Sequence, residues 1–103
     1  MQKIIDGKRY NTKTAKLVAE DGEHYRSDFN FWSEGLYLTS KGQWFLHGEG
    51  GGLSKYAESA SGGGWTGGTD IRPLTEQEAF EWFCHHADPE DAAEHFSDLI
   101  EDA

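Results

Sequence analysis

Residues 75–103 hold ten carboxylates and no lysine or arginine, whereas residues 1–74 hold nine acids and nine bases. The formal net charge of −10 therefore belongs to the C-terminal quarter. Segregated charge usually reflects the partners of a protein rather than its fold. The chemistry that suits this segment is the binding of cationic side chains on another protein. The carboxylates are Glu76, Glu78, Glu81, Asp88, Glu90, Asp91, Glu94, Asp98, Glu101 and Asp102.

Several of these acids recur at three- or four-residue intervals near the C-terminus. On a helix, side chains four residues apart are separated by about 6 Å along the axis. Such a row of negative charges is similar to the phosphates of a nucleic-acid strand, so a protein that grips phosphates with lysine and arginine can also grip the row. The principal contacts are expected to be Glu90, Glu94, Asp98 and Glu101, with support from Glu76, Glu78, Glu81 and Asp91.

Two other interpretations fit the same acids. They can form a solvated face that keeps the protein soluble, or they can pair with bases of the N-terminal part. Surface ion pairs of the second kind contribute only about 0–1 kcal/mol each. The candidate bases are Lys3, Lys8, Arg9, Lys13 and Lys16.

Enzymatic chemistry has weaker support in the sequence. General acid–base catalysis needs a carboxyl group in a desolvated pocket, and the acids that lie near glycines and aromatic residues are Glu34, Glu49 and Asp70. The adjacent residues 84–86, a cysteine and two histidines, diverge around a helix, and the chain has no C-x-x-C or H-E-x-x-H pattern. The sequence therefore predicts no catalytic residue, no metal site and no cofactor.

The segment over residues 48–68 is rich in glycine, with nine in all. The Walker pattern is absent, and we expect the glycines to permit tight turns and close backbone approach to large aromatic rings. Two alternative functions follow from this segment. An aromatic and glycine-rich surface can dock on a protein partner, or the glycine-rich loops can hold a small ligand or substrate. The aromatic residues of the first alternative are Trp32, Trp44, Tyr56 and Trp65.

The elements that must position these residues follow from local patterns. An Asp-Gly turn predicts a hairpin over residues 3–10, and apolar positions 14/15 and 18/19 predict a short amphipathic helix that ends at Asp21-Gly22. The aromatic and β-branched composition favours strands over 29–33, 36–39 and 43–47, the last two as a hairpin. Residues 53–58 suggest a short helix, and residues 69–74 a final strand that Pro73 places at a sheet edge.

Two amphipathic helices are expected at the C-terminus. Thr75 and Glu78 form a capping box, and Asp88 caps a second helix with Pro89 in its first turn. We therefore predict a single α+β domain over residues 1–103: a small, mainly antiparallel sheet of 3–5 strands, one short N-terminal helix and two C-terminal helices. Residues 1–74 form its charge-balanced, sheet-rich part, and residues 75–103 its acidic helical part.

Three stretches of the chain resemble a group of small uncharacterised proteins carried by phages and mobile elements. They are residues 3–15, with Lys3-Ile4-Ile5-Asp6-Gly7; residues 36–57, with Trp44-Phe45-Leu46-His47-Gly48-Glu49-Gly50-Gly51; and residues 71–79, with Arg72-Pro73-Leu74-Thr75. The resemblance implies a phage or mobile-element setting. Because small acidic proteins of such elements are often inhibitors of host defence, it also implies an anti-CRISPR or anti-restriction role.

The sequence thus predicts a non-enzymatic inhibitor of a bacterial defence complex. Its partner is expected to be a basic, nucleic-acid-binding protein subunit, because the charge of −10 disfavours direct contact with nucleic acid or anionic membrane. The absence of a long apolar run, of an apolar N-terminal segment and of a second cysteine predicts the cytoplasm of the bacterial host.

Overall fold

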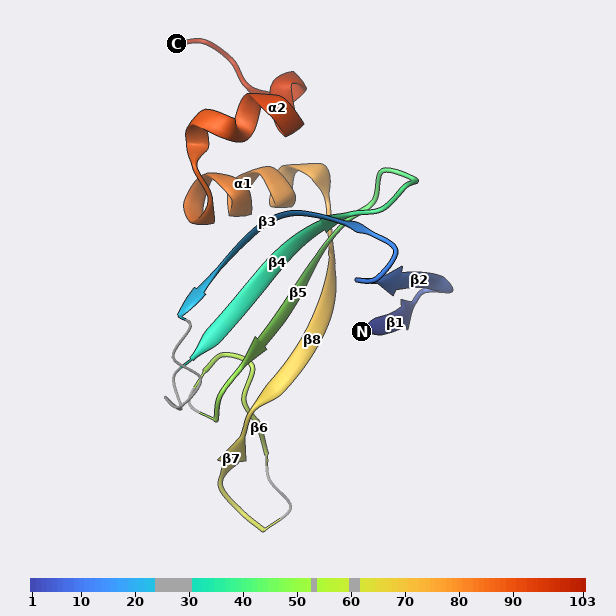
Figure 1. The fold of residues 1–103 in the computed structure, drawn as a ribbon, viewed down its shortest axis with the longest axis vertical. Coiled ribbons are helices and arrows are strands. Elements are labelled where there is room, and N and C mark those ends of the chain that lie inside the picture. Colours follow the sequence, from blue (N-terminus) through green and yellow to red (C-terminus); the bar gives the residue numbers. More distant parts are fainter. Residues whose placement is uncertain (24–30, 53, 60–61) are drawn as a thin grey trace.

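A four-stranded antiparallel sheet forms the centre of the computed structural model, which describes residues 1–23, 31–52, 54–59 and 62–103 (Figure 1). Its strand order is β3-β4-β5-β8. The bounds are β3 (Lys16–Glu23), β4 (Trp32–Leu38), β5 (Trp44–Gly50) and β8 (Gly68–Leu74). Since β8 lies at an edge, the prediction from Pro73 is confirmed.

Two hairpins and two helices complete the α+β fold. Strands β1 (Gln2–Ile5) and β2 (Lys8–Asn11) form a hairpin. Its turn lies at Asp6-Gly7, as the sequence predicts, and both turn residues have positive φ. Strands β6 (Glu58–Ser59) and β7 (Trp65–Thr66) pair in an arm that projects from one end of the sheet (Figure 1). Helices α1 (Glu76–His86) and α2 (Ala92–Phe96) lie at the other end. No described helix has the length and apolarity that crossing a membrane requires.

The helices cover one face of the sheet because α1 has an apolar side that contacts β3, β5 and β8. Leu36, Leu46 and Leu74 of the sheet pack there with Trp82 and Phe83 of α1. Trp44 stacks on Phe96 of α2 with ring centroids 4.8 Å apart. Burying each such side chain contributes about 1.5–3 kcal/mol. The capping box at Thr75 is present, with the Thr75 hydroxyl 3.1 Å from the Glu78 nitrogen.

The opposite face carries a smaller core beneath hairpin β1–β2. Phe45 and Ile71 of the sheet are buried there against Tyr10 of β2. The Tyr10 and Phe45 rings meet edge to face at 5.6 Å. This contact holds the N-terminal hairpin against the sheet, next to the turn between β4 and β5.

The predicted N-terminal helix is wrong, because residues 16–23 form strand β3. A β-bulge lies between Leu17 and Ala19, so the partly buried Val18 and Ala19 both pack on the helix-side core. Two successive inward residues hide the period-two alternation of a strand and leave a pattern that a helix also fits. Asn11 does organise a turn, since its side chain accepts a hydrogen bond from Lys13 N at 2.9 Å. Asp21-Gly22 lies within β3 rather than after a helix.

Three further boundaries differ from the prediction. Strand β4 runs unbroken from Trp32 to Leu38, so residues 31–33 begin no separate strand, and residues 29–30 lie outside the described residues. Residues 54–58 form turns and the start of β6 rather than a helix, and Leu53 is not described. The second C-terminal helix is short, because α2 is flanked by 3₁₀ turns at Pro89–Asp91 and Ser97–Leu99.

Candidate functional site

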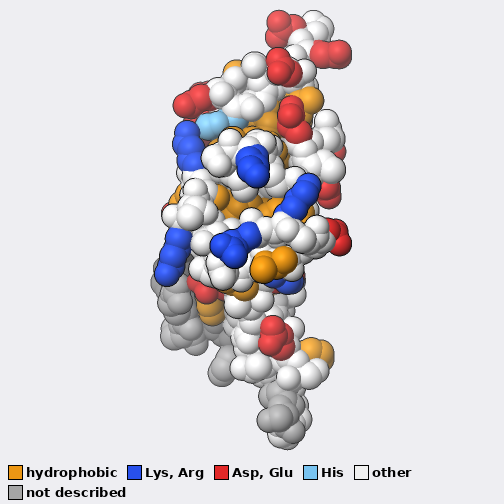
Figure 2. Space-filling view, turned by 90° about the vertical axis from the view of Figure 1, so that its right-hand side faces the viewer, with side chains coloured by type: hydrophobic (Ala, Val, Ile, Leu, Met, Phe, Trp, Pro, Cys, Tyr) orange, Lys and Arg blue, Asp and Glu red, His pale blue; other side chains and the backbone are white. Residues whose placement is uncertain are grey.

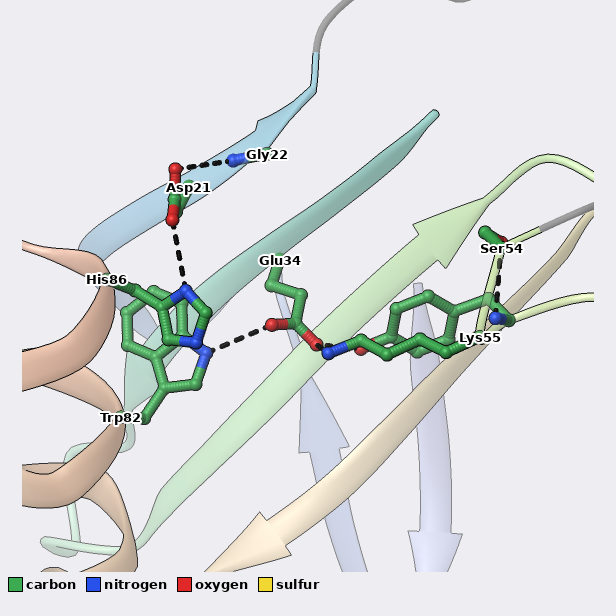
Figure 3. A network of polar contacts seen from close by, with 8 residues as sticks. Asp21, Gly22, Glu34, Ser54, Lys55, Trp82 and His86 are labelled. Atoms are coloured by element: carbon green, nitrogen blue, oxygen red, sulfur yellow. Dashed lines mark hydrogen bonds and ion pairs between the residues drawn. The ribbon is translucent and has the colours of Figure 1, made fainter. Parts of the chain in front are cut away.

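Glu34 is the buried acid of the described residues, and both of its carboxylate oxygens have polar partners. Its side chain is 2% exposed and lies on the helix-side face of β4 (Figure 3). Trp82 of α1 donates its indole N–H to Oε1 at 3.1 Å. On the other oxygen, the Tyr56 hydroxyl donates a hydrogen bond and the Lys55 ammonium forms an ion pair at 2.7 Å. We call Glu34, Lys55, Tyr56 and Trp82 the Glu34 network.

Close approach of residues 54–56 to the sheet requires glycine in β5. A side chain on Gly48 would overlap the Tyr56 ring, and one on Gly50 would overlap Ser54. Ser54 shapes this loop, since its hydroxyl donates to Gly51 O at 2.7 Å and accepts from Tyr56 N at 3.2 Å. The expected role of the glycines is thus confirmed at Gly48, where the ring that approaches the backbone is that of Tyr56.

The three donors keep Glu34 ionised. Burial by itself raises the pKa of the Glu34 carboxyl, but the hydrogen bonds from Lys55, Tyr56 and Trp82 outweigh burial and bring the pKa below its ordinary value of 4.5. Burial and the neighbouring Glu34 raise the pKa of the Tyr56 hydroxyl, which therefore keeps its proton and donates it. A carboxylate saturated with donors suits a structural role better than general acid catalysis.

This arrangement predicts an acid-sensitive contribution to stability. Because the folded-state pKa of Glu34 is lowered, its contribution is fully present above pH 4.5 and is lost as the pH falls through the folded-state value. We expect the difference in unfolding free energy between wild type and Glu34→Gln to be constant from pH 7 to about pH 5 and to shrink below it. Urea unfolding at each pH measures this difference.

The pKa values of Asp70 and Glu78 are also lowered, so both residues contribute to the pH dependence of wild-type stability. Taking the difference between wild type and Glu34→Gln isolates the contribution of Glu34. A difference that stays constant down to pH 3 contradicts the prediction.

A histidine extends the network toward β3. His86 stacks on Trp82 with centroids 4.7 Å apart and meets Trp32 edge to face at 5.9 Å. Its Nδ1 lies 3.0 Å from Asp21 Oδ2, and the other Asp21 oxygen accepts from Gly22 N at 2.8 Å. Lys55 covers the outer side of Trp32, 5.4 Å from the ring centroid. Together these contacts join α1, β3, β4 and the loop before β6 (Figure 3).

A small pocket of about 180 Å³ adjoins the Glu34 network, and its walls carry charges of both signs. Two of the three acids that the sequence placed near a pocket, Glu34 and Asp70, line it, whereas Glu49 does not. Asp70 forms an ion pair with Lys3 at 2.6 Å. The pocket is smaller than the roughly 300–1,000 Å³ of typical ligand sites. It therefore gives little support to a ligand site in the glycine-rich segment.

All ten carboxylates of residues 75–103, which we call the acidic segment, are exposed. Among the described residues, none of them forms an ion pair with a lysine or arginine, so the alternative of pairing with N-terminal bases is not supported. Three have local roles: Glu78 and Asp88 cap helix starts, and Glu81 accepts from Gln77 at 3.3 Å. The others belong to α1, α2 and the segments around α2, which lie at the end of the molecule opposite the arm (Figure 1).

The acids do not form the regular row that the sequence suggested. Glu90 lies in the first 3₁₀ turn, Glu94 in α2, Asp98 in the second 3₁₀ turn and Glu101 beyond it. Ala93 and Ile100 are exposed, so the apolar residues of this segment do not form one continuous buried side as in the amphipathic helix that was expected. The helix ends at Phe96, which is the last fully buried residue of the chain. The charge is thus dense but not spaced like a strand of phosphates.

The predicted aromatic surface does not form as one patch. Trp44 is 6% exposed and belongs to the core, which removes it from any docking surface. Trp32 and Tyr56 are half-buried beneath Lys55 and within the Glu34 network. Trp65 is 65% exposed, on the projecting arm.

Histidines and acids do not gather into a metal site within the described part of the chain. His24 lies outside that part. Comparisons with protein-family models, with curated proteins and with solved structures gave no match to the chain, so the family resemblance stays a prediction.

Proposed function

We propose that the protein is a non-enzymatic inhibitor whose acidic segment binds a cationic, nucleic-acid-binding surface of a bacterial defence complex of the CRISPR–Cas type. The observation that carries the proposal is the exposure of all ten carboxylates in a segment without lysine or arginine. Such a surface attracts a positively charged partner and accelerates encounter with it.

Most carboxylates of the acidic segment have no partner among the described residues, and this distinguishes the segment from an ordinary solvated face. Seven of its ten carboxylates make no hydrogen bond or ion pair with the described residues. They are Glu76, Glu90, Asp91, Glu94, Asp98, Glu101 and Asp102. Like charges on neighbouring turns repel one another by a few tenths of a kcal/mol per pair. A cationic partner removes that repulsion on binding, and surfaces that bind nucleic acid supply the required density of lysine and arginine.

The irregular spacing of the acids indicates which kind of charge recognition the proposed binding would use. Because Glu90, Glu94 and Asp98 lie on different short elements, the proposed recognition depends on summed charge rather than on a phosphate-like repeat. Affinity is then expected to fall steeply with salt. The phage or mobile-element setting implied by the resemblance favours a defence complex as the target.

Inhibition of DNA binding tests the proposal. Purified CRISPR effector complexes of several types are incubated with the protein, and their binding of target DNA is measured by gel shift. We expect the protein to displace DNA from at least one complex, and excess DNA to displace the protein in turn. A complex that holds protein and DNA together contradicts the competition, and a panel without inhibition contradicts the choice of target.

A second candidate contact is the arm that ends in β6 and β7. Trp65 is the most exposed large hydrophobic side chain of the described residues, at 65%. The neighbouring Gly63 and Gly64 both have positive φ, which fixes the turn that presents it. Tryptophan is enriched among the residues that dominate binding energy at protein interfaces.

Under this second candidate, Trp65→Ala is expected to weaken target binding by about 30-fold, which corresponds to about 2 kcal/mol. Thermal stability should stay within about 0.5 kcal/mol of wild type, because the ring is exposed. Titration calorimetry with the inhibited complex measures the affinity. An unchanged affinity removes the arm as a contact and leaves the acidic segment.

A further inference from the structure

A cleft of about 540 Å³ lies between the N-terminal hairpin and the turn that joins β4 to β5. One wall is the outer half of the hairpin, residues 7–11 with Thr14, and the other is residues 39–43. The contact of Tyr10 with Phe45 holds the first wall in place. Gly7 and Gly42 have φ of +76° and +84° and form the turns of the two walls, with open space where a side chain would be. The topology therefore builds a defined concavity from two segments that are distant in the sequence.

Every charged residue that lines this cleft is positive, although the protein carries a net charge of −10. These residues are Lys8, Arg9 and Lys41. All three are exposed, and none forms an ion pair with a carboxylate in the described ranges. Residues 1–16 add to the potential, since they hold five bases and one acid. Figure 2 shows several lysine and arginine side chains across the middle of this face, with acidic side chains above, beside and below them.

Neutral donors supplement the cations. Thr39 and Ser40 line the cleft and carry hydroxyl groups. The Thr39 oxygen accepts a hydrogen bond from Gln43 N at 3.0 Å, which leaves the hydroxyl proton free to donate. The Gln43 side-chain amide donates to the backbone oxygens of Trp44 and Leu74. It therefore stabilises the wall of the cleft and is not a donor for a ligand. Cations beside hydroxyl donors are the groups that hold phosphate in proteins.

We propose that this cleft, which we call the basic cleft, binds a phosphorylated ligand of nucleotide size. Lys8 and Arg9 hold phosphate oxygens from the hairpin wall, and Lys41 holds them from the opposite turn. The volume lies within the range of small-molecule sites and exceeds what a single phosphate fills. Because the lining contains no acid, a bound anion is attracted by all three cations and is repelled by no residue of the lining. This site is separate from the acidic segment and goes beyond the proposed inhibition.

Titration calorimetry with pyrophosphate, ADP and adenosine tests the site. We expect saturable binding of one pyrophosphate or ADP per chain and no binding of adenosine, which lacks phosphate. The double variant Lys8→Gln/Lys41→Gln should weaken pyrophosphate binding at least tenfold, because hydrogen bonds to charged groups are the stronger class. Inhibition of DNA binding should be unaffected, which separates failure of this site from failure of the proposed function.

The matched control is Lys13→Gln/Lys16→Gln, which removes the same charge from exposed lysines that do not line the basic cleft. Its affinity for pyrophosphate should stay within threefold of wild type. Equal losses in both double variants overturn the proposal, since they indicate general attraction to a basic face. Absence of saturable binding overturns it as well, and so does binding of oligonucleotides that strengthens with length while ADP does not bind.

Discussion

Replacing Glu34 by glutamine is expected to lower the free energy of unfolding by about 3 kcal/mol. The exchange keeps the size of the side chain but removes the charge that the Lys55 ammonium and the Tyr56 hydroxyl share. The amide NH2 that replaces one carboxylate oxygen donates rather than accepts, so it opposes at least one of the three donors. Lys55 is 60% exposed and water can take over its ammonium, whereas the Trp82 contact is buried. We therefore place the loss at the low end of the range for broken buried pairs.

A loss of this size is a large part of the roughly 5–15 kcal/mol that stabilises a small domain. Urea unfolding followed by circular dichroism measures it. Tyr56→Phe removes one donor and leaves the carboxylate with two others, so it should cost only about 1 kcal/mol. Glu58→Gln, at an exposed acid on β6, should change stability by less than about 0.5 kcal/mol. Equal stability of Glu34→Gln and Glu58→Gln contradicts the structural role of the Glu34 network.

Reversing two charges of the acidic segment is expected to abolish target binding while the fold survives. The variant Glu94→Lys/Asp98→Lys places two cations where the proposed contact needs anions. Close charge pairs at interfaces couple by about 1.5 kcal/mol or more, so two reversals should weaken affinity at least a hundredfold. Both side chains are exposed and make no hydrogen bond or ion pair in the described part of the chain, so stability should change little. Gel shift with the inhibited complex measures the loss.

The matched control is Asp6→Lys/Glu20→Lys, which changes the net charge by the same amount at exposed positions that lie outside both the acidic segment and the arm. Screening at physiological salt has a length of about 8 Å, so charges away from the contact contribute weakly. The control should keep its affinity within about fivefold. If both variants inhibit as wild type does, the acidic segment serves solubility alone, and the arm with Trp65 becomes the leading contact.

Local patterns in the sequence were sufficient to predict several elements of the fold. The Asp-Gly turn of the first hairpin, the capping box at Thr75 and the cap at Asp88 each depend on residues that are close neighbours along the chain. The exposure of the acidic segment was also predictable, since unpaired carboxylates are rarely buried. Strand β3 was not predictable, because its bulge imitates helical spacing.

The sequence by itself determined where charge accumulates, where chains turn and where helices begin, because neighbours along the chain decide those features. Tertiary structure alone decided that Glu34 is the buried acid, since its donors Tyr56 and Trp82 are distant from it along the chain. It also decided that Gly48 admits the Tyr56 ring, and that Lys8 and Lys41 face one cleft. The physical reason is that burial and electrostatic potential depend on distance in space, which strand pairing sets.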